Sequence, residues 1–175
     1  MNLKNIIIRI IEDMTGIYSE QILNECIFLT ASDINTNIDE ILLKKLKKEN
    51  EGKCVKAGYI MHDSIKILSR SLGQINNANF NSVITFNVCY KATLCNPGIG
   101  AIVKCYITSI DKTQIVCNVE TNENISPLAI YLFKNHHVGN IDFIKLAIND
   151  KINVKILASK FNYGDSQIIA IGKFE

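Results

Sequence analysis

The chain has 175 residues, of which 47% are apolar, which is enough for one medium domain or two small domains with hydrophobic cores, so a mainly disordered chain is excluded. Its 19 Lys and Arg residues nearly balance 17 Asp and Glu residues, and the net charge of +2 excludes a histone-like or polybasic nucleic-acid binder. Only Arg9 and Arg70 are arginines, and the abundance of Ile, Asn and Lys is typical of an AT-rich genome.

The six cysteines are even in number and could indicate a disulfide framework. The chain is, however, long enough to fold without cross-links, and Cys105 and Cys117 lie in alternating apolar segments where a free thiol acts as a small hydrophobic group. We therefore expect a reducing, intracellular environment. Residues 5–11 lack the features of an exported leader, and no transmembrane segment is predicted.

The chain begins with a mixed set of predicted elements. Apolar residues at three- and four-residue spacing, followed by Gly16, predict a short amphipathic helix over residues 3–14. Residues 17–34 are rich in Ile, Leu, Phe and Thr and favour an extended strand.

The segment from Thr36 to Gly52 carries the clearest local signal and predicts a helix. Thr36 and Asp39 form a capping-box pattern, and Gly52 supplies the left-handed residue at the exit. The lysines near its C-terminal end favour a solvated end matched to the helix dipole, with a nucleic-acid patch as the alternative. The apolar stripe consists of Ile38, Ile41, Leu42 and Leu46, and the lysines are Lys44, Lys45, Lys47 and Lys48.

Strands are expected at residues 53–61, 64–69 and 82–94, with a polar, Asn-rich loop at 73–81. In the last of these strands the side chains alternate, which predicts one buried face and one wet face. The buried face consists of Phe86, Val88 and Tyr90, and the wet face of Asn87, Cys89 and Lys91. The first half is therefore expected to be a helix packed on an antiparallel sheet.

The tripeptide Asn96-Pro97-Gly98 is the strongest break in the sequence and predicts a domain boundary. After it the pattern consists of strands alone. Several short strands in a small segment are typical of a closed barrel of the OB type. The expected strands are residues 101–110, 114–120, 127–133, 151–158 and 167–174.

The sequence shows no set of residues typical of catalysis. His62 stands alone, and His136 and His137 are adjacent, so in an extended segment their rings point to opposite faces and cannot easily share a metal ion. The segment Gly98-Ile99-Gly100 precedes a strand and lacks a third glycine, so it does not predict a phosphate loop. We expect no catalytic residue, no metal site and no cofactor.

A small barrel can bind single-stranded RNA by stacking bases on aromatic side chains beside lysines. By alternation Tyr106 shares a face with Lys104, and further candidates lie around the loop between the last two strands. The alternative is that Tyr106 packs in the core and the lysines only increase solubility. The candidate RNA-binding residues are Lys104, Tyr106, Lys155, Lys160, Phe161 and Tyr163.

An ordered set of motifs resembles one known family. In chain order these are a Leu- and Lys-rich helix at residues 42–48, Glu51-Gly52-Lys53-Cys54, Gly58-Tyr59-Ile60, the Phe-Asn-Val-Cys-Tyr-Lys-Ala strand at residues 86–92, and Pro97-Gly98. From about Tyr18 to its end, the chain resembles the stalk subunit of multisubunit DNA-dependent RNA polymerases, which is the seventh-largest subunit of eukaryotic RNA polymerase II and has a counterpart in the archaeal enzyme.

The resemblance implies an α+β protein without its own catalytic residues. Residues 1–17 would be an N-terminal extension, residues 18–97 a truncated RNP-like tip domain that docks on the polymerase core near the clamp, and residues 98–175 an OB-type, S1-like barrel. The implied partners are the large core subunits, a second stalk subunit and nascent RNA, with no membrane. The implied role is to support transcription initiation and to guide the transcript.

By the same resemblance, residues 52–62 and the loop at 69–81 are expected to dock on the core. The glycine-rich aromatic strand of RNA-binding S1 barrels is not recognisable between Asn124 and Asp150. The resemblance therefore implies the docking role independently of RNA binding. The composition fits a large DNA virus, with location in host cytoplasm and virion, or a cellular gene whose product is nuclear. The alternatives are a free-standing OB-fold RNA-binding protein and a small enzyme. The docking residues are Gly52, Gly58, Tyr59, Ile60, Leu72 and Gly73.

Overall fold

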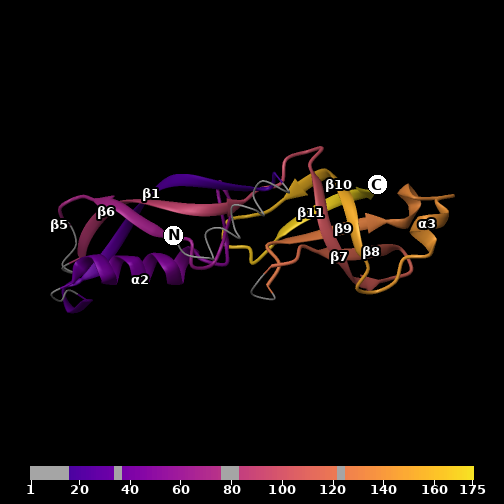
Figure 1. The fold of residues 1–175 in the computed structure, drawn as a ribbon. Helices are drawn as coiled ribbons and strands as arrows, with labels where there is room; N and C mark the ends of the chain where they lie inside the picture. Colours follow the sequence, from indigo (N-terminus) through magenta and orange to yellow (C-terminus); the bar gives the residue numbers. More distant parts are fainter. Residues whose placement is uncertain (1–15, 34–36, 76–82, 122–124) are drawn as a thin grey trace. The chain divides into compact units, whose positions relative to one another are not determined.

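The computed structural model describes residues 16–33, 37–75, 83–121 and 125–175 (Figure 1). The chain is mostly β and divides into two compact units. The sheet unit comprises Glu20–Glu51 and Ile60–Thr93, and the barrel unit comprises residues 16–19, Gly52–Tyr59 and Leu94–Glu175. The helix predicted at residues 3–14 lies outside the described residues. Within those residues, no helix is both long enough and apolar enough to cross a membrane.

The predicted strands of the first half are present in one six-stranded sheet. The segment predicted as a single strand at 53–61 is instead a hairpin of two short strands, because the chain turns at Lys56 and Ala57. The loop prediction is wrong at Gln74 and Ile75, which pair with Thr85 and Ile84. Along the sheet the order is β1 (Tyr18–Thr30), β6 (Val83–Cys95), β3 (Gly58–Ile60) and β2 (Cys54–Val55), while β4 (Lys66–Arg70) and β5 (Gln74–Ile75) pair with β6.

Helix α2 (Ile38–Asn50) confirms the strongest helix prediction. Its N-cap residue is Asn37, so the proposed cap at Thr36 is wrong in position, and Thr36 itself lies outside the described residues. The helix ends as expected, because Gly52 adopts a left-handed φ of 74° that a side chain would strain.

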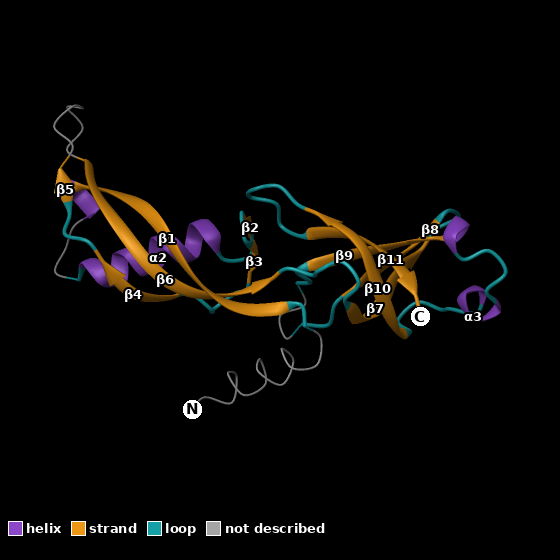
Figure 2. Cartoon of the chain, turned by 90° about the horizontal axis from the view of Figure 1, so that it is seen from above, coloured by secondary structure: helices purple, strands orange, loops and turns teal. Residues whose placement is uncertain are grey.

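The core of the sheet unit forms where α2 covers one face of the sheet (Figure 2). Phe86, Val88 and Tyr90 of β6 are buried as predicted, and the neighbours between them are more exposed. The alternation of apolar and polar residues therefore predicted the buried face of β6 correctly, since successive side chains of a strand point to opposite sides of a sheet. The other buried apolar residues of this unit include Ile27, Leu29, Leu42, Leu46 and Ile65.

In the second half of the chain the five predicted strands are present, and they form a closed barrel. Around the barrel the order is β10-β11-β9-β8-β7, with β11 and β9 parallel and the other neighbours antiparallel. This closed arrangement is compatible with an OB-type barrel. The elements are β7 (Ile102–Ile110), β8 (Gln114–Asn118), β9 (Leu128–Phe133), the 3-10 turn η2 (Lys134–His136), α3 (Ile141–Ile144), β10 (Lys151–Lys160) and β11 (Ile168–Phe174).

The barrel interior is closely packed around Gly172. A Cβ atom at this position would lie 2.2 Å from Val154 Cγ1 and 3.0 Å from Ile130 Cγ2, so only glycine fits without displacing the core. Cys105 and Cys117 are buried, as expected for free thiols that act as small hydrophobic groups. All six cysteines are free.

Candidate functional site

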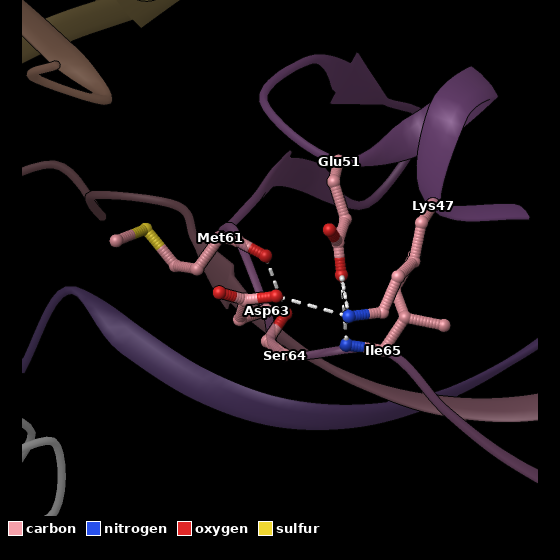
Figure 3. Close-up of polar contacts among 6 residues, drawn as sticks. All are labelled: Lys47, Glu51, Met61, Asp63, Ser64 and Ile65. Atoms are coloured by element: carbon pink, nitrogen blue, oxygen red, sulfur yellow. Dashed lines mark hydrogen bonds and ion pairs between the residues drawn. The ribbon is translucent and has the colours of Figure 1, made fainter. Parts of the chain in front are cut away.

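The C-terminal end of α2 is tied to the turn at residues 61–65, next to the stretch predicted to dock on a partner (Figure 3). Lys47 Nζ donates a hydrogen bond to Asp63 Oδ1 at 3.0 Å and lies 3.9 Å from Glu51 Oε1. Glu51 Oε1 also accepts from the Ile65 N–H at 3.3 Å. Within the turn, Ser64 Oγ donates to the Met61 carbonyl at 2.6 Å. Helix and turn are therefore held together by side chains from both segments.

Two lysines of α2, Lys45 and Lys47, have structural partners within the unit. The hydrogen bond to Asp63 is the main reason why the pKa of Lys47 is raised above its ordinary value. Lys45 Nζ donates to the Phe28 carbonyl of β1 at 2.5 Å. Asp63 has a φ of 52°, a left-handed conformation that Asp tolerates better than most residues. These contacts favour the structural interpretation of the lysine run over the nucleic-acid patch.

Three of the predicted docking residues form strand β3 and lie in the interior. Tyr59 and Ile60 are buried, so their side chains support the surface from below and do not reach it. Gly58 has a φ of 140°, and a Cβ there would lie 2.6 Å from the Cys95 carbonyl oxygen. The motif Gly58-Tyr59-Ile60 therefore holds the hairpin in place, and sequence reasoning alone could not distinguish this from a surface role.

The other predicted docking residues lie at turns. Gly52 forms the left-handed exit of α2, and Gly73 lies tightly against β6, because its Cβ would be 2.7 Å from Ile84 Cγ2. Leu72 is 86% exposed and is the one docking candidate whose side chain faces solvent. Gly52, Gly58 and Tyr59 belong to the barrel unit, whereas Ile60, Leu72 and Gly73 belong to the sheet unit.

Within the barrel unit, the β2–β3 hairpin binds the loop that follows β10. The Cys54 N–H donates to the Asp165 carbonyl, and the Gly164 N–H donates to the Cys54 carbonyl, both at 2.8 Å. The pKa of the Cys54 thiol is raised to about 11, mainly because the thiol is buried and to a smaller extent because the negative charge of Asp165 is nearby. Tyr163 is exposed in this loop, so the hairpin fixes the backbone beside one of the predicted RNA-binding residues. This pairing had no signal in the sequence.

The outer face of the barrel brings together half of the predicted RNA-binding residues. As predicted, Lys104 and Tyr106 of β7 share one face of the strand, and this face lies outside the barrel. Their neighbours Val103 and Cys105 point inward and are buried. The alternative that Tyr106 packs in the core is therefore wrong. Lys155 of β10 lies opposite Ile102, one diagonal step from Lys104.

Several polar residues of this face were missed from the sequence. Lys151 lies opposite Tyr106, and Asn153 lies opposite Lys104. Lys173 of β11 lies opposite Lys155. The alternation Lys-Ile-Asn-Val-Lys at residues 151–155 carried the signal, because its polar positions share a face. The pairing of β10 with β7 was needed to place that face beside Lys104.

Carboxylates reduce the positive charge of this face. Lys151 Nζ lies 2.8 Å from Glu120 Oε2, and Lys155 Nζ lies 3.7 Å from Glu175 Oε1. Both pairs are solvent-exposed and therefore weak, so a phosphate could compete for either lysine.

The remaining predicted RNA-binding residues form a second group at the end of β10. Lys160 is exposed and lies opposite Ile169, and Phe161 and Tyr163 follow it in the loop. The structure therefore divides the predicted set in two. One group is Lys104, Tyr106 and Lys155, and the other is Lys160, Phe161 and Tyr163.

His137 and the buried cysteine Cys95 have structural roles. His137 is buried, accepts a hydrogen bond on Nε2 from the Phe174 N–H at 2.9 Å, and has Nδ1 2.9 Å from the Phe133 carbonyl. Burial raises the pKa of Cys95 to about 12, and such a thiol is neutral at physiological pH and a poor nucleophile. In the described part of the chain, no three His, Cys, Asp or Glu side chains are grouped to hold a metal ion.

No family model matches this chain, and no curated protein matches it. The interpretation of function therefore depends on the ordered motifs and on where the fold places their residues.

Proposed function

We propose that the chain is a non-catalytic stalk subunit of a multisubunit DNA-dependent RNA polymerase, with the sheet unit as an RNP-like tip and the barrel as an OB-type domain. The observation that carries the proposal is the combination, in one chain, of a helix-covered antiparallel sheet and a closed five-stranded barrel. This is the architecture that the ordered motifs imply. The large polymerase subunits would be its partners.

The motif residues occupy positions where their identity matters, which supports the proposal. Gly52 and Gly58 have backbone conformations that favour glycine, and Gly58 has no room for a Cβ. Phe86 and Tyr90 place the Phe-Asn-Val-Cys-Tyr strand in the core. A family signature made of such residues is expected to persist when surface residues change.

The strand order of the barrel supports the OB assignment. In this barrel the third strand, β9, pairs in parallel with the fifth strand, β11, and the other neighbours are antiparallel. Two parallel strands need a crossover connection between them. Here that connection contains η2, α3 and β10, as expected for an OB-type barrel. An OB-type barrel serves as a binding module for oligonucleotides and oligosaccharides. The proposal therefore needs no active site.

Docking is tested by Leu72, because it is the exposed member of the docking set. We expect Leu72→Glu to abolish co-purification with the large polymerase subunits, since a carboxylate would be desolvated at an apolar contact. The matched control is Val138→Glu in the barrel unit, where Val138 is 85% exposed, close to the 86% of Leu72. Both variants should keep the wild-type melting temperature.

The measurement is affinity purification of the tagged chain from its native cells at moderate salt, with mass spectrometry of the recovered proteins. Recovery of the two largest polymerase subunits with the wild type and with Val138→Glu, but not with Leu72→Glu, is the expected result. Purification of the wild type without any polymerase subunit would contradict the proposal.

A free-standing OB-fold RNA-binding protein is the second candidate, favoured by the outer face with Lys104, Tyr106 and Lys155. It predicts that the purified chain binds a short single-stranded RNA, and that Tyr106→Ala weakens binding by about 1–3 kcal/mol through lost stacking. Lys66→Ala, at an exposed lysine of the sheet unit, is the control. Fluorescence anisotropy between about 50 and about 200 mM salt should show a steep loss of affinity.

A further inference from the structure

Strand β1 lies at one edge of the sheet (Figure 2). Among the described residues, β6 is the strand that pairs with it. From Glu20 to Thr30 its side chains alternate without interruption between a more exposed and a less exposed face. Unbroken alternation excludes a bulge in this stretch, so the backbone N–H and C=O groups also alternate in direction, one residue toward β6 and the next away from it.

Two contacts show which residues point away from β6. The Phe28 carbonyl accepts from Lys45 Nζ of α2 at 2.5 Å, and the Thr30 N–H donates to Asp33 Oδ2 at 2.9 Å. Even-numbered residues therefore direct their backbone groups outward. These two contacts block the end of the strand at Phe28 and Thr30. We call the preceding outward residues the open edge: Glu20, Ile22, Asn24 and Cys26.

The open edge lacks two of the features that often protect an edge strand, proline and lysine. Ile22 is 64% exposed on its outer face. The two carboxylates of this part of β1, Glu20 and Glu25, already have partners within the unit. Glu20 lies 2.6 Å from Lys91 Nζ, and Glu25 accepts from Asn50 Nδ2 at 2.6 Å. An incoming strand would therefore meet no unpaired charge.

We propose that the open edge pairs with the open edge of a second copy of this chain, antiparallel about a two-fold axis at Leu23. In this register Ile22 lies opposite Asn24 of the second copy, and Glu20 lies opposite Cys26 of the second copy. Both are hydrogen-bonded pairs, because the outward groups are those of even-numbered residues. The two copies together would form one continuous sheet.

The strand is self-complementary in this register, which is why the occupant is a second copy. Leu23 meets its own equivalent on the inner face, and the two Ile22 side chains are diagonal neighbours on the outer face. Glu25 lies opposite Gln21, so no carboxylate opposes a carboxylate. The pairing also ends at Cys26, before the carbonyl of Phe28 that Lys45 occupies. This inference does not depend on the proposed polymerase role.

The first test measures the mass of the purified full-length chain by sedimentation across a wide dilution series. We expect a dimer that dissociates on dilution. Ile22→Lys and Ile22→Glu should each be monomeric, and their equimolar mixture should dimerise, because the diagonal pair becomes an ion pair. Leu68→Lys, at an exposed apolar residue of β4, is the control and should behave as wild type.

The second test fixes the register with disulfides in a Cys26→Ser background. Leu23→Cys should cross-link two chains under mild oxidation, because non-hydrogen-bonded pairs bring Cα atoms to about 4.5 Å, within the range of a disulfide. Gln21→Cys, on the same face, should not cross-link. A wild-type chain that stays monomeric at every concentration overturns the proposal, and so does a dimer that persists in Ile22→Lys and fails to cross-link through Leu23→Cys.

Discussion

At the scale of single residues, His137 shows how a polar side chain becomes part of the barrel. Its Nε2 accepts from Phe174 and its Nδ1 faces the Phe133 carbonyl, so both ring nitrogens are satisfied by the backbone of two strands. The ring also stacks on Phe143 with centroids 4.1 Å apart. A neutral ring with its proton on Nδ1 fits both contacts. The sequence showed only two adjacent histidines, and the tertiary contacts assign the structural role to the second.

Asp33 supplies a prediction on pH at the same scale. Thr30 Oγ1 donates to Asp33 Oδ2 at 2.6 Å, and this hydrogen bond is the main reason why the pKa of Asp33 is lowered from 3.8. Because the folded pKa is lowered, the contact stabilises the fold above the unfolded pKa, and this contribution is lost as pH falls through the folded pKa. The loss therefore occurs below about pH 5, where the unfolded carboxyl begins to bind protons.

We expect Thr30→Val to raise the pKa of Asp33 toward its ordinary value and to flatten this acid-induced loss of stability. The measurement is an NMR titration of the Asp33 carboxyl carbon, with chemical denaturation at several pH values. Ser32→Ala is the control, because it leaves the Thr30–Asp33 contact in place. An Asp33 pKa that is the same in wild type and Thr30→Val would refute the assignment.

At the scale of elements, the buried side chains that alternate along β6 contribute strongly to the stability of the sheet unit. Phe86 is 3% exposed between the sheet and α2, with the Arg70 guanidinium 5.7 Å from its ring centroid. Phe28 of β1 is 55% exposed on the opposite face. The same residue type therefore occurs in a packed and an open environment within one unit. Helix α2 depends on the same packing, since Leu42 and Leu46 are fully buried.

Phe86→Ala is expected to lower the free energy of unfolding by about 3–5 kcal/mol, because it removes a buried aromatic ring and leaves a cavity. Phe28→Ala should change it by about 0.5 kcal/mol or less, as is usual for surface positions. Guanidinium denaturation followed by circular dichroism measures both. Equal losses in the two variants would mean that the buried face of β6 is assigned incorrectly.

At the scale of the whole molecule, the cysteines report which parts of the chain are accessible. Cys26 and Cys89 of the sheet unit are exposed and half-buried, respectively, whereas the other four cysteines are buried in the barrel unit. Burial raises the pKa of Cys54 to about 11 and that of Cys95 to about 12, and the neutral thiol is a weak nucleophile. Burial therefore lowers the reactivity of these thiols in two ways, because it blocks access of a reagent and keeps the thiol neutral.

In dilute, folded protein we expect iodoacetamide to modify Cys26 first and Cys89 more slowly, while the four buried cysteines react only after unfolding. Peptide mass spectrometry over a time course gives the order. Labelling in guanidinium, where all six should react at similar rates, is the control. Early modification of Cys95 or Cys105 under native conditions would show that the barrel unit opens more readily than its packing indicates.

The sequence by itself determined the long elements, because periodicity is local and each long strand or helix shows its buried face through its own residues. Alternation predicted the buried face of β6 and the five barrel strands, and the apolar stripe and the glycine signal predicted α2 and its exit at Gly52. The sequence also led to the candidate residues of the outer barrel face, through Lys104 and Tyr106.

Only the tertiary structure decided which elements meet. The parallel pairing of β9 with β11, the pairing of β10 with β7, and the hydrogen bonds from Cys54 to the loop at Asp165 join residues far apart in the chain. Such pairings are chosen by the packing of the whole core, since one strand pattern is compatible with several neighbours and registers. For the same reason Ile60, which the family resemblance suggested for the docking surface, lies in the interior.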